Sequence, residues 1–335
     1  MQQSVRRLHL ESLMIKPQLC KAIPVETIRK AHNNYWNDYY VELKIDGWRG
    51  IITKKNGVVQ LFSRTGKEYT QHVPDIMQYV NDWVPDNTIL DGEIVFYDRT
   101  IPTFLIEDQV IVATNFSTTA KIMGSGWRVA LEKQAALDST GNMAFMPFDV
   151  LMFGGEDITN LPFNERRACL DQLDITDDYL STLMLPVPRW DHCNVKKLFD
   201  EVSQYGLEGL VLKDWTAPYV EGSRKHQLKV KSERYFDVIV YGFEPGKGKY
   251  EGTVGALKFA VFEDGGLKPI GQCSGMDDET RDIWYNWLSD YKGLEWPVIE
   301  IKCNELTVHG VPRHPQYIRT RPDKDMTECT AEQFV

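Results

Sequence analysis

The hydrophobic and polar positions of this chain alternate in short segments that predict strands joined by tight turns. Apolar residues dominate Val41–Ile45, Gly50–Thr53 and Val58–Phe62, and Asn56-Gly57 stands between the last two segments. An Asn-Gly pair between two such segments is a strong signal for a β-hairpin. Lys44 is therefore expected near the end of a strand, on a rigid scaffold.

Two segments show helical spacing. Asn194 opens the first with apolar residues on one helical face, and Gly206 ends it. The second runs from about Asp278 to Ser289. A strand that reads as buried, Gly209–Lys213, directly follows the first helix.

The character of the chain changes near Tyr235, where short strands and glycine turns begin. Asp237–Gly242 and Ala256–Phe262 read as strands, and Asp264-Gly265-Gly266 as a turn. This region is expected to form a small β barrel interrupted by one helix. We therefore expect an α+β protein with one domain at 1–234 and a second at 235–335.

Composition supports two packed domains and no membrane segment. The chain has 335 residues and 42% hydrophobic content, which is enough for two cores. No run approaches the roughly 18 apolar residues of a membrane span, and the N-terminus leads into no apolar signal segment. We expect a cytoplasmic monomer, in the host cytoplasm if the source is a phage, without a membrane partner.

Cysteine spacing and net charge narrow further the classes of protein to which this chain can belong. The six cysteines form no C-x-x-C pair and none is spaced with a histidine as zinc ligands are. Reduced thiols are expected. The net charge of −10 argues mildly against a polyanionic partner, yet it leaves room for a local basic face.

The segment Lys44-Ile45-Asp46-Gly47-Trp48-Arg49 combines a lysine, a carboxylate and an arginine across a glycine bend. This combination suits covalent nucleotide transfer: Lys44 attacks phosphorus, Asp46 and Gly47 shape the turn, and Arg49 reaches the sugar or a phosphate. A K-x-D-G pattern alone occurs by chance in about one in ten chains of this length. The interpretation therefore depends on further clusters downstream.

Two carboxylates fall in apolar strands. Glu93 lies in Leu90–Val95, and Glu208 precedes Gly209–Lys213. A buried carboxylate without a partner is costly, so each is expected to meet a cation or a hydroxyl. Together they could hold Mg²⁺ against phosphate oxygens. An ion pair with a neighbouring lysine is an equally open interpretation for either one.

Leu228-Lys229-Val230-Lys231 alternates apolar and basic residues, so a strand there presents both ammonium groups on one face. These cations could bind an α-phosphate and stabilise charge in the transition state. They are also expected to lower the pKa of Lys44, which must lose its proton to attack.

Three further clusters are candidates. Phe148, which precedes an aspartate, is expected at the end of a strand. Its ring could stack on a purine there, although most phenylalanines in such positions belong to the hydrophobic core. Arg64 lies in a Ser63–Lys67 turn that reads in isolation as solvated. The segment Arg313–Lys324 concentrates cations among aromatic and proline residues, which favours placed side chains over a basic tail.

In order, these clusters resemble the motifs of the covalent nucleotidyltransferases, and most closely those of small two-domain ATP-dependent DNA ligases of bacteriophages and some bacteria. The resemblance covers nearly the whole chain. The matching segments are Lys44–Arg49, Ser63–Gly66, Asp91–Glu93, Phe148-Asp149, Glu208–Val211, Leu228–Lys231 and Arg321–Lys324.

The resemblance implies an ATP-grasp-like nucleotidyltransferase domain of antiparallel sheets with helices, followed by an OB-fold domain. It also implies ATP and Mg²⁺ as cofactors, nicked duplex DNA as substrate, and lysyl-AMP and DNA-adenylate as intermediates. The biological roles implied are DNA replication, repair and recombination.

The resemblance also implies individual residue roles. Lys44, Asp46, Lys229 and Lys231 would be catalytic. Glu42 would read the adenine amino group, Arg49 and Glu93 the ribose side, Arg64 the ribose or the nick phosphate, and Glu208 the metal, with Glu93 a second metal ligand. Arg321, Asp323 and Lys324 would orient pyrophosphate.

Other classes share part of this chemistry. An RNA ligase or an mRNA capping guanylyltransferase is the nearest rival, but the Arg321–Lys324 segment in a β-rich second domain favours a DNA ligase. An NAD-dependent ligase is disfavoured because no zinc spacing and no additional N-terminal domain are found. A nucleic-acid-binding OB protein with a degenerate, inactive enzyme domain is disfavoured by a set of intact residues: Lys44, Glu93, Glu208, Lys229 and Lys231. Residues in 99–144 receive no assignment.

Overall fold

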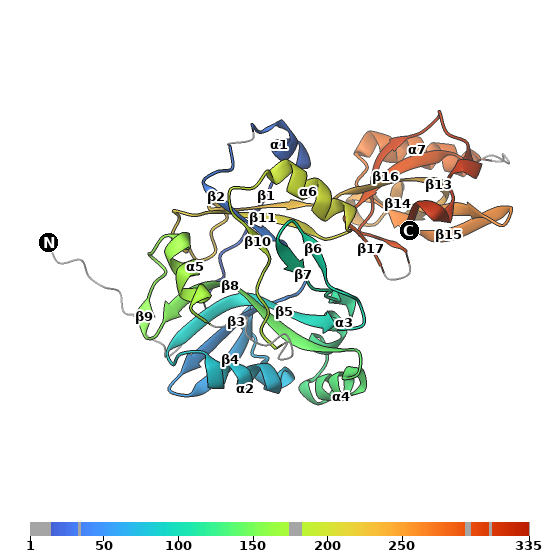
Figure 1. The fold of residues 1–335 in the computed structure, drawn as a ribbon. Coiled ribbons are helices and arrows are strands. Elements are labelled where there is room, and N and C mark those ends of the chain that lie inside the picture. Colours follow the sequence, from blue (N-terminus) through green and yellow to red (C-terminus); the bar gives the residue numbers. More distant parts are fainter. Residues whose placement is uncertain (1–14, 33–34, 174–182, 292–295, 308–309, 335) are drawn as a thin grey trace. The chain divides into compact units, whose positions relative to one another are not determined.

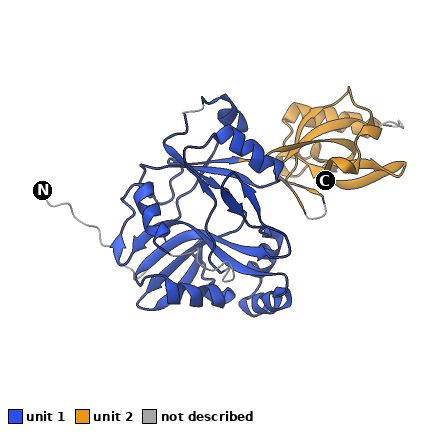
Figure 2. Ribbon diagram, in the orientation of Figure 1, with its two compact units in different colours: residues 1–230 blue, residues 231–335 orange. Residues whose placement is uncertain are grey.

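The computed structural model describes residues 15–32, 35–173, 183–291, 296–307 and 310–334 (Figure 1). The chain divides into two compact units, Met1–Val230 (unit 1) and Lys231–Val335 (unit 2), coloured separately in Figure 2. The expected second domain starts at Tyr235, four residues after Lys231. Only residues 232 and 233 separate strand β12 (Gln227–Lys231) from strand β13 (Arg234–Pro245).

In the described residues, unit 1 holds two five-stranded sheets. The first has the strand order β1 (Lys21–Ala22), β12 (Gln227–Lys231), β11 (Gly209–Asp214), β2 (Tyr39–Leu43) and β10 (Arg189–Trp190). Strand β2 pairs antiparallel with both β10 and β11, whereas β1 runs parallel to β12. Helices α1 (Val25–Lys30) and α6 (Val195–Gln204) share one apolar cluster with β2 and β11.

The second sheet has the order β4 (Val58–Ser63), β3 (Trp48–Lys55), β5 (Thr88–Asp98), β8 (Gly141–Phe153) and β9 (Glu156–Asp157). The predicted hairpin is confirmed, because β3 pairs with β4 across Asn56 and Gly57, whose φ values are 49° and 74°. The core cluster at this sheet also takes side chains from α2 (Pro74–Trp83), α3 (Phe116–Met123), α4 (Trp127–Leu137) and α5 (Phe163–Asp171).

The unassigned segment 99–144 is structured. It contains the hairpin β6 (Phe104–Ile106) and β7 (Gln109–Ile111), then α3 and α4, and ends in β8. Helix α4 is tied to the 3-10 turn Thr70–His72 because the side-chain amide of Gln134 donates to the carbonyl of His72 at 2.8 Å. The segment therefore belongs to the body of unit 1.

A fully buried ion pair joins β8 to α5. The guanidinium of Arg166 donates from Nε and Nη2 to the two carboxylate oxygens of Asp149 at 2.8 and 2.9 Å. Arg166 also donates from Nη1 to the carbonyls of Leu161 and Ala217. Because every polar atom of this charged pair is used, its burial is compensated and α5 is fixed against the sheet.

Unit 2 is a small β barrel, as predicted. Its strands follow the order β15 (Gly266–Cys273), β14 (Val254–Glu263), β13 (Arg234–Pro245), β16 (Val298–Cys303) and β19 (Gln316–Thr320). A bridge between Ser274 and Gln316 joins the two edge strands, with the amide of Tyr317 donating to the carbonyl of Ser274 at 2.7 Å. This contact closes the sheet. The α+β fold class is thereby confirmed.

Both predicted helices are present and capped. The Asn194 side chain accepts from the Lys197 amide at the start of α6, and Asp277 caps α7 (Asp278–Asp290) by accepting from the Thr280 amide. The remaining short elements are β17 (Glu305–Leu306), β18 (Pro312–Arg313) and the 3-10 turns Gly248–Tyr250, Met326–Glu328 and Ala331–Phe334. Among the described residues, no helix has the length and apolar character needed to cross a membrane.

Replacing Arg166 by Met should destabilise unit 1 by about 3–5 kcal/mol, because the carboxylate of Asp149 would stay buried without a counter-charge. Urea unfolding of the full chain, followed by tryptophan fluorescence, measures the change. Lys197→Met serves as control, since the Lys197 side chain is 62% exposed and pairs only at the surface. If both variants unfold at the wild-type urea concentration, the buried pair does not stabilise the fold.

Candidate active site

Lys44 and Glu208 meet because two distant strands pair. Lys44 directly follows β2 and Glu208 directly precedes β11, and Leu43 lies opposite Leu210 in the antiparallel ladder. The amide of Lys44 donates to the carbonyl of Gly209 at 2.9 Å. The Lys44 ammonium then lies 2.5 Å from Oε2 of Glu208. Glu208 thus forms an ion pair with a lysine, and that lysine is Lys44; its role as a metal ligand stays a prediction.

The expectation that neighbouring cations lower the pKa of Lys44 is wrong for this structure. Burial alone would lower it, but the charge and hydrogen bond of Glu208, with smaller contributions from Glu93 and Asp46, raise the pKa of Lys44 above its ordinary value. The physical reason is proximity, since the nearest charge is a carboxylate. In this state Lys44 is a protonated amine and cannot act as a nucleophile.

Gly47 allows the turn after Lys44 to lie against β5. A Cβ at Gly47 would stand 2.8 Å from the carbonyl oxygen of Ile94 and 2.9 Å from a methyl group of Val95. Only a residue without a side chain fits so close to that backbone. The prediction that Gly47 shapes this turn therefore has a steric basis.

Arg49 is held by Asp91, which lies in the Asp91–Glu93 segment but was given no role of its own. Its guanidinium donates to both oxygens of Asp91, each at 2.6 Å, and to the carbonyl of Gln18 at 3.2 Å. The hydroxyl of Tyr219 also donates to Asp91 at 2.8 Å. Asp91 could have been found as the buried acid two residues before Glu93. Arg49 lines the cavity described below, and its predicted contact with ribose stays a prediction.

Glu93 has one carboxylate oxygen without a hydrogen bond in the part of the chain that the structure describes. Its Oε2 atom is buried and makes no hydrogen bond among the described residues. Burial raises the pKa of Glu93 to about 8, although the nearby charges of Arg49 and Lys44 act in the opposite direction. A ligand hydroxyl or cation reaching this oxygen would satisfy it.

Phe148 does not end a strand, contrary to expectation, but lies inside β8. Asp149 pairs with Asp91 and Pro147 with Gly92, so Phe148 is an extra residue without a partner in β5. This β-bulge changes which way the residue faces. The ring is 8% exposed and lies 4.4 Å from both the Arg49 guanidinium and the Lys213 ammonium.

Lys213 was not predicted as a site residue. Its ammonium lies 2.7 Å from Oε2 of Glu42 and donates to the carbonyl of Phe148 at 3.0 Å. The Lys213 and Glu42 side chains are both 3% exposed. A lysine in a strand otherwise apolar enough to be buried was the available signal, since such a charge needs a partner.

A cavity of about 190 Å³ brings most of these side chains together. Its charged and aromatic lining residues are Glu42, Lys44, Arg49, Arg64, Glu93, Phe148, Lys213 and Lys229. Seven of the predicted site residues thus share one cavity, and Glu208 contacts Lys44 beside it. Lys231, the last residue of β12, and Asp46 are not among the residues that line this cavity.

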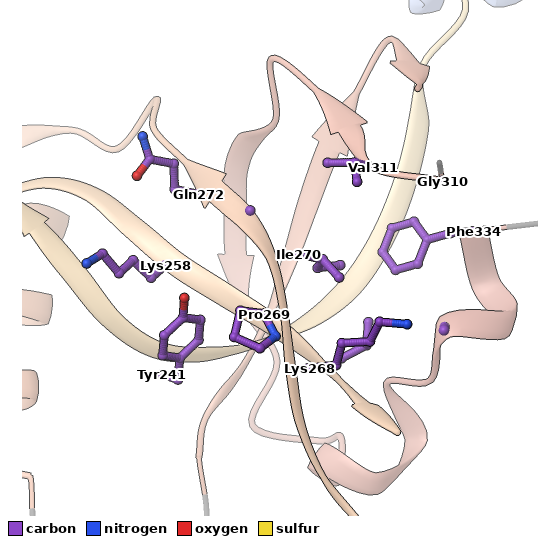
Figure 3. Close-up of a pocket in the computed structure, with 12 residues that line it drawn as sticks. Tyr241, Lys258, Lys268, Pro269, Ile270, Gln272, Gly310, Val311 and Phe334 are labelled. Carbon is purple, nitrogen blue, oxygen red and sulfur yellow. The ribbon is translucent and has the colours of Figure 1, made fainter. Parts of the chain in front are cut away.

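Two larger cavities lie elsewhere. Figure 3 shows one of about 840 Å³ on the barrel of unit 2, where Lys258 and Lys268 accompany Tyr241, Ile270 and Phe334. The other, about 790 Å³, lies beside β10. Neither includes Lys44. The predicted site residues therefore gather at the smallest of these three cavities.

The donor set for a metal is limited. Within the described residues no group of three or more His, Cys, Asp or Glu side chains is placed to hold an ion. Glu93 and Glu208 both act electrostatically on Lys44. Mg²⁺ is commonly held by one or two carboxylates together with substrate phosphates and water. This pair fits a metal that arrives with a nucleotide.

The three predicted residues near the C-terminus form one cluster in unit 2. Arg321 donates to Asp323 at 2.8 Å and to Asp237 at 2.9 Å, and Lys324 lies 3.1 Å from Asp237. The hydrogen bond from Arg321 lowers the pKa of Asp323 to about 2. Glu300 lies 3.8 Å from Arg321. Asp237 and Glu300 were not predicted, because their strands read simply as barrel.

Comparison with known families decides the class of the chain. Residues 17–231 match the ATP dependent DNA ligase domain, and residues 245–321 match the DNA ligase OB-like domain. The chain belongs to the ATP-dependent DNA ligase family. The ligase domain match covers nearly all described residues of unit 1, including each residue that lines the Lys44 cavity.

Individual ligases support the same assignment. The DNA ligase of Methanospirillum hungatei is 29% identical over 87% of this chain and 53% of its own length. DNA ligase C2 of Mycolicibacterium smegmatis is 25% identical over 88% of this chain and 89% of its own. The chain spans about half the length of several curated relatives it matches.

A solved structure entitled "DNA binding with a minimal scaffold: Structure-function analysis of Lig E DNA ligases" shares the fold. It aligns with a TM-score of 0.60 at 20% identity, covering 92% of this chain and all of its own. At this identity the likeness concerns the fold alone. It agrees with the predicted order of a nucleotidyltransferase fold followed by an OB barrel.

Replacing Glu208 by Gln should lower the pKa of Lys44, because burial would remain while the main opposing charge is lost. The pH dependence of Lys44 modification by an amine reagent, read by mass spectrometry in metal-free buffer, measures the shift. Asp214→Asn is the control, since that carboxylate pairs with His226 rather than with a lysine of the cavity. An unchanged Lys44 profile in Glu208→Gln would contradict the role of the ion pair.

Proposed function

We propose that this protein is an ATP-dependent DNA ligase that seals nicks in duplex DNA through lysyl-AMP and DNA-adenylate intermediates. One observation carries the proposal: Lys44 stands against Glu208 at a cavity that also holds Glu93, Phe148 and Lys229, in a chain of the DNA ligase family. A lysine so placed can form a phosphoramide, and the surrounding charges can hold a nucleotide triphosphate.

In the first step, Nζ of Lys44 attacks the α-phosphorus of ATP. A nitrogen–phosphorus bond forms, the bond from that phosphorus to the β-phosphate oxygen breaks, and pyrophosphate leaves. Lys44 must first lose its proton. Glu208 would hold a Mg²⁺ that arrives with the nucleotide, and without the Glu208 charge the burial of Lys44 would favour the neutral amine, with its proton released to solvent. The metal supplies charge neutralisation of the phosphates.

In the second step, an oxygen of the 5′-phosphate at a nick attacks the phosphorus held by Lys44. The nitrogen–phosphorus bond breaks, and AMP passes to the DNA. In the third step the 3′-hydroxyl attacks the 5′-phosphate, a phosphodiester bond forms, and AMP leaves. Lys229 and Lys231 are proposed to stabilise the charge of the α-phosphate, while Asp46 supports the turn beside Lys44.

The cavity also suggests how the nucleoside is held. We place the base against Phe148, with Glu42 at its amino group and the ribose hydroxyls near Glu93 and Arg49. The buried unpaired oxygen of Glu93 supports this assignment, because a ribose hydroxyl would satisfy it. Arg49 and Lys213 also lie over the Phe148 ring, each 4.4 Å from its centroid. Arg64, exposed at the cavity, is assigned to the ribose or the nick phosphate.

Arg321, Asp323 and Lys324 are proposed to orient the pyrophosphate leaving group during the first step. This role requires unit 2 to approach the cavity for nucleotide transfer and to release it for DNA. The cluster supports the role because Asp237, Glu300 and Asp323 hold the cations in fixed positions. We further propose that the protein acts as a monomer in DNA replication, repair and recombination.

Wild-type protein incubated with α-labelled ATP and Mg²⁺ should acquire acid-stable label, and Lys44→Ala should acquire none, because the attacking amine is gone. Electrophoresis after acid quenching measures the label. Lys55→Ala, at the far end of β3, is the matched control and should label normally. Label from GTP or NAD in place of ATP, or label on Lys44→Ala, would overturn the proposal.

Lys324→Ala should lower the rate of labelling from ATP at least tenfold while sealing of a pre-adenylated nick stays near the wild-type rate. The reason is that pyrophosphate leaves only in the first step. Lys302→Ala removes another ion-paired lysine of unit 2 and should leave both rates unchanged. Equal losses in both assays would exclude a role specific to pyrophosphate.

A further inference from the structure

Glu42 is a buried carboxylate with one oxygen held by Lys213 and the other without a hydrogen bond among the described residues. It lies on β2 and its side chain is 3% exposed. Its Oε2 atom is 2.7 Å from the Lys213 ammonium, whereas Oε1 has no hydrogen-bond partner among the described residues. An unused oxygen on a buried carboxylate is expensive unless a ligand completes it.

Lys213 holds that carboxylate from a defined position. Its ammonium also donates to the carbonyl of Phe148 at 3.0 Å and lies 4.4 Å from the Phe148 ring. The backbone carbonyl, the ring and Glu42 thus fix one end of Lys213 at the same wall of the cavity. Lys213 therefore couples the position of the carboxylate to that of the aromatic ring.

A second cation stands behind Glu42. Nη1 of Arg167 is 4.0 Å from Oε1, too far for a hydrogen bond, and makes no other bond among the described residues. Arg167 is itself anchored by its Nε atom to Asp171 at 3.0 Å. Both cations therefore face the Glu42 carboxylate, whose oxygens are hydrogen-bond acceptors.

We propose that Lys213 is a positioning residue for base selection: by fixing Oε2 of Glu42 it leaves Oε1 as the acceptor for the exocyclic amine of adenine. Guanine carries a carbonyl oxygen at the same ring position. Two acceptors facing each other repel, and a base with neither group leaves Oε1 unsatisfied. The inference rests on the proposed function, because it assumes that Glu42 meets the base.

Purine riboside triphosphate tests the inference, because it lacks only the 6-amino group of ATP. For wild type, kcat/KM for self-labelling should favour ATP over this analogue. In Lys213→Met the preference should fall about tenfold or more, the usual worth of a hydrogen bond to a charged group. The loss should appear in the KM for ATP, since the base is bound alike in ground and transition states. Lys213→Arg, which keeps the charge, should restore most of the preference.

Two comparisons separate a positioning role of Lys213 from a purely structural one. Lys54→Met removes a partly buried lysine of unit 1 that bonds only to backbone carbonyls among the described contacts, and it should keep the wild-type preference. Glu42→Gln should lose the preference, and Lys213→Met added to it should lose no more. Lys213→Met leaves the buried charge of Glu42 without its cation. If that variant does not fold, the double variant, which lacks the Glu42 charge, is compared with Glu42→Gln instead.

The outcomes are distinct. An unchanged preference in Lys213→Met, an equal loss for both nucleotides, or a further loss of preference in the double variant overturns the role of Lys213 while leaving the ligase proposal intact. A wild-type protein that takes no label from ATP overturns the proposed function and this inference together.

Discussion

The pairing of β2 with β11 is the constraint on which the site depends. It joins residues 164 positions apart in the chain and sets Lys44 against Glu208. The same ladder carries Glu42 on one strand and Lys213 on the other. A single antiparallel register therefore places Lys44, its counter-charge Glu208 and the carboxylate of Glu42. A shift of one residue would turn every one of these side chains to the opposite face.

Local signals in the sequence predicted much of this architecture. The Asn56-Gly57 turn and the Asn194 cap are encoded within a few residues, and both are present as expected. Glu93 and Glu208 stood out because a carboxylate in an apolar strand is costly. The closure of the barrel through Ser274 and Gln316 had no such signal. It arises from two edges that meet only in the folded unit.

The sequence showed which charged residues matter more readily than it showed which groups those residues bind. The sequence suggested cations around Lys44, yet the nearest group is the Glu208 carboxylate, and the pKa of Lys44 rises instead of falling. Asp91 and Lys213 were missed for the same reason, since their importance lies in what they bind. Alternation along one strand says which face a residue occupies. It does not say which distant strand supplies the counter-charge.

The bulge at Phe148 limits how this family member can change in length. The extra residue in β8 lets an aromatic ring contact Arg49 and Lys213 while its neighbour Asp149 stays bound to Arg166. Deleting one residue between Phe145 and Asp149 would remove this bulge from the pairing of β8 with β5. The Phe148 ring and the Asp149 carboxylate would then lose their present surroundings. Insertions and deletions in this stretch would therefore disturb the site even where the residue types are kept. Variation in length belongs in the loops, such as the β6–β7 turn.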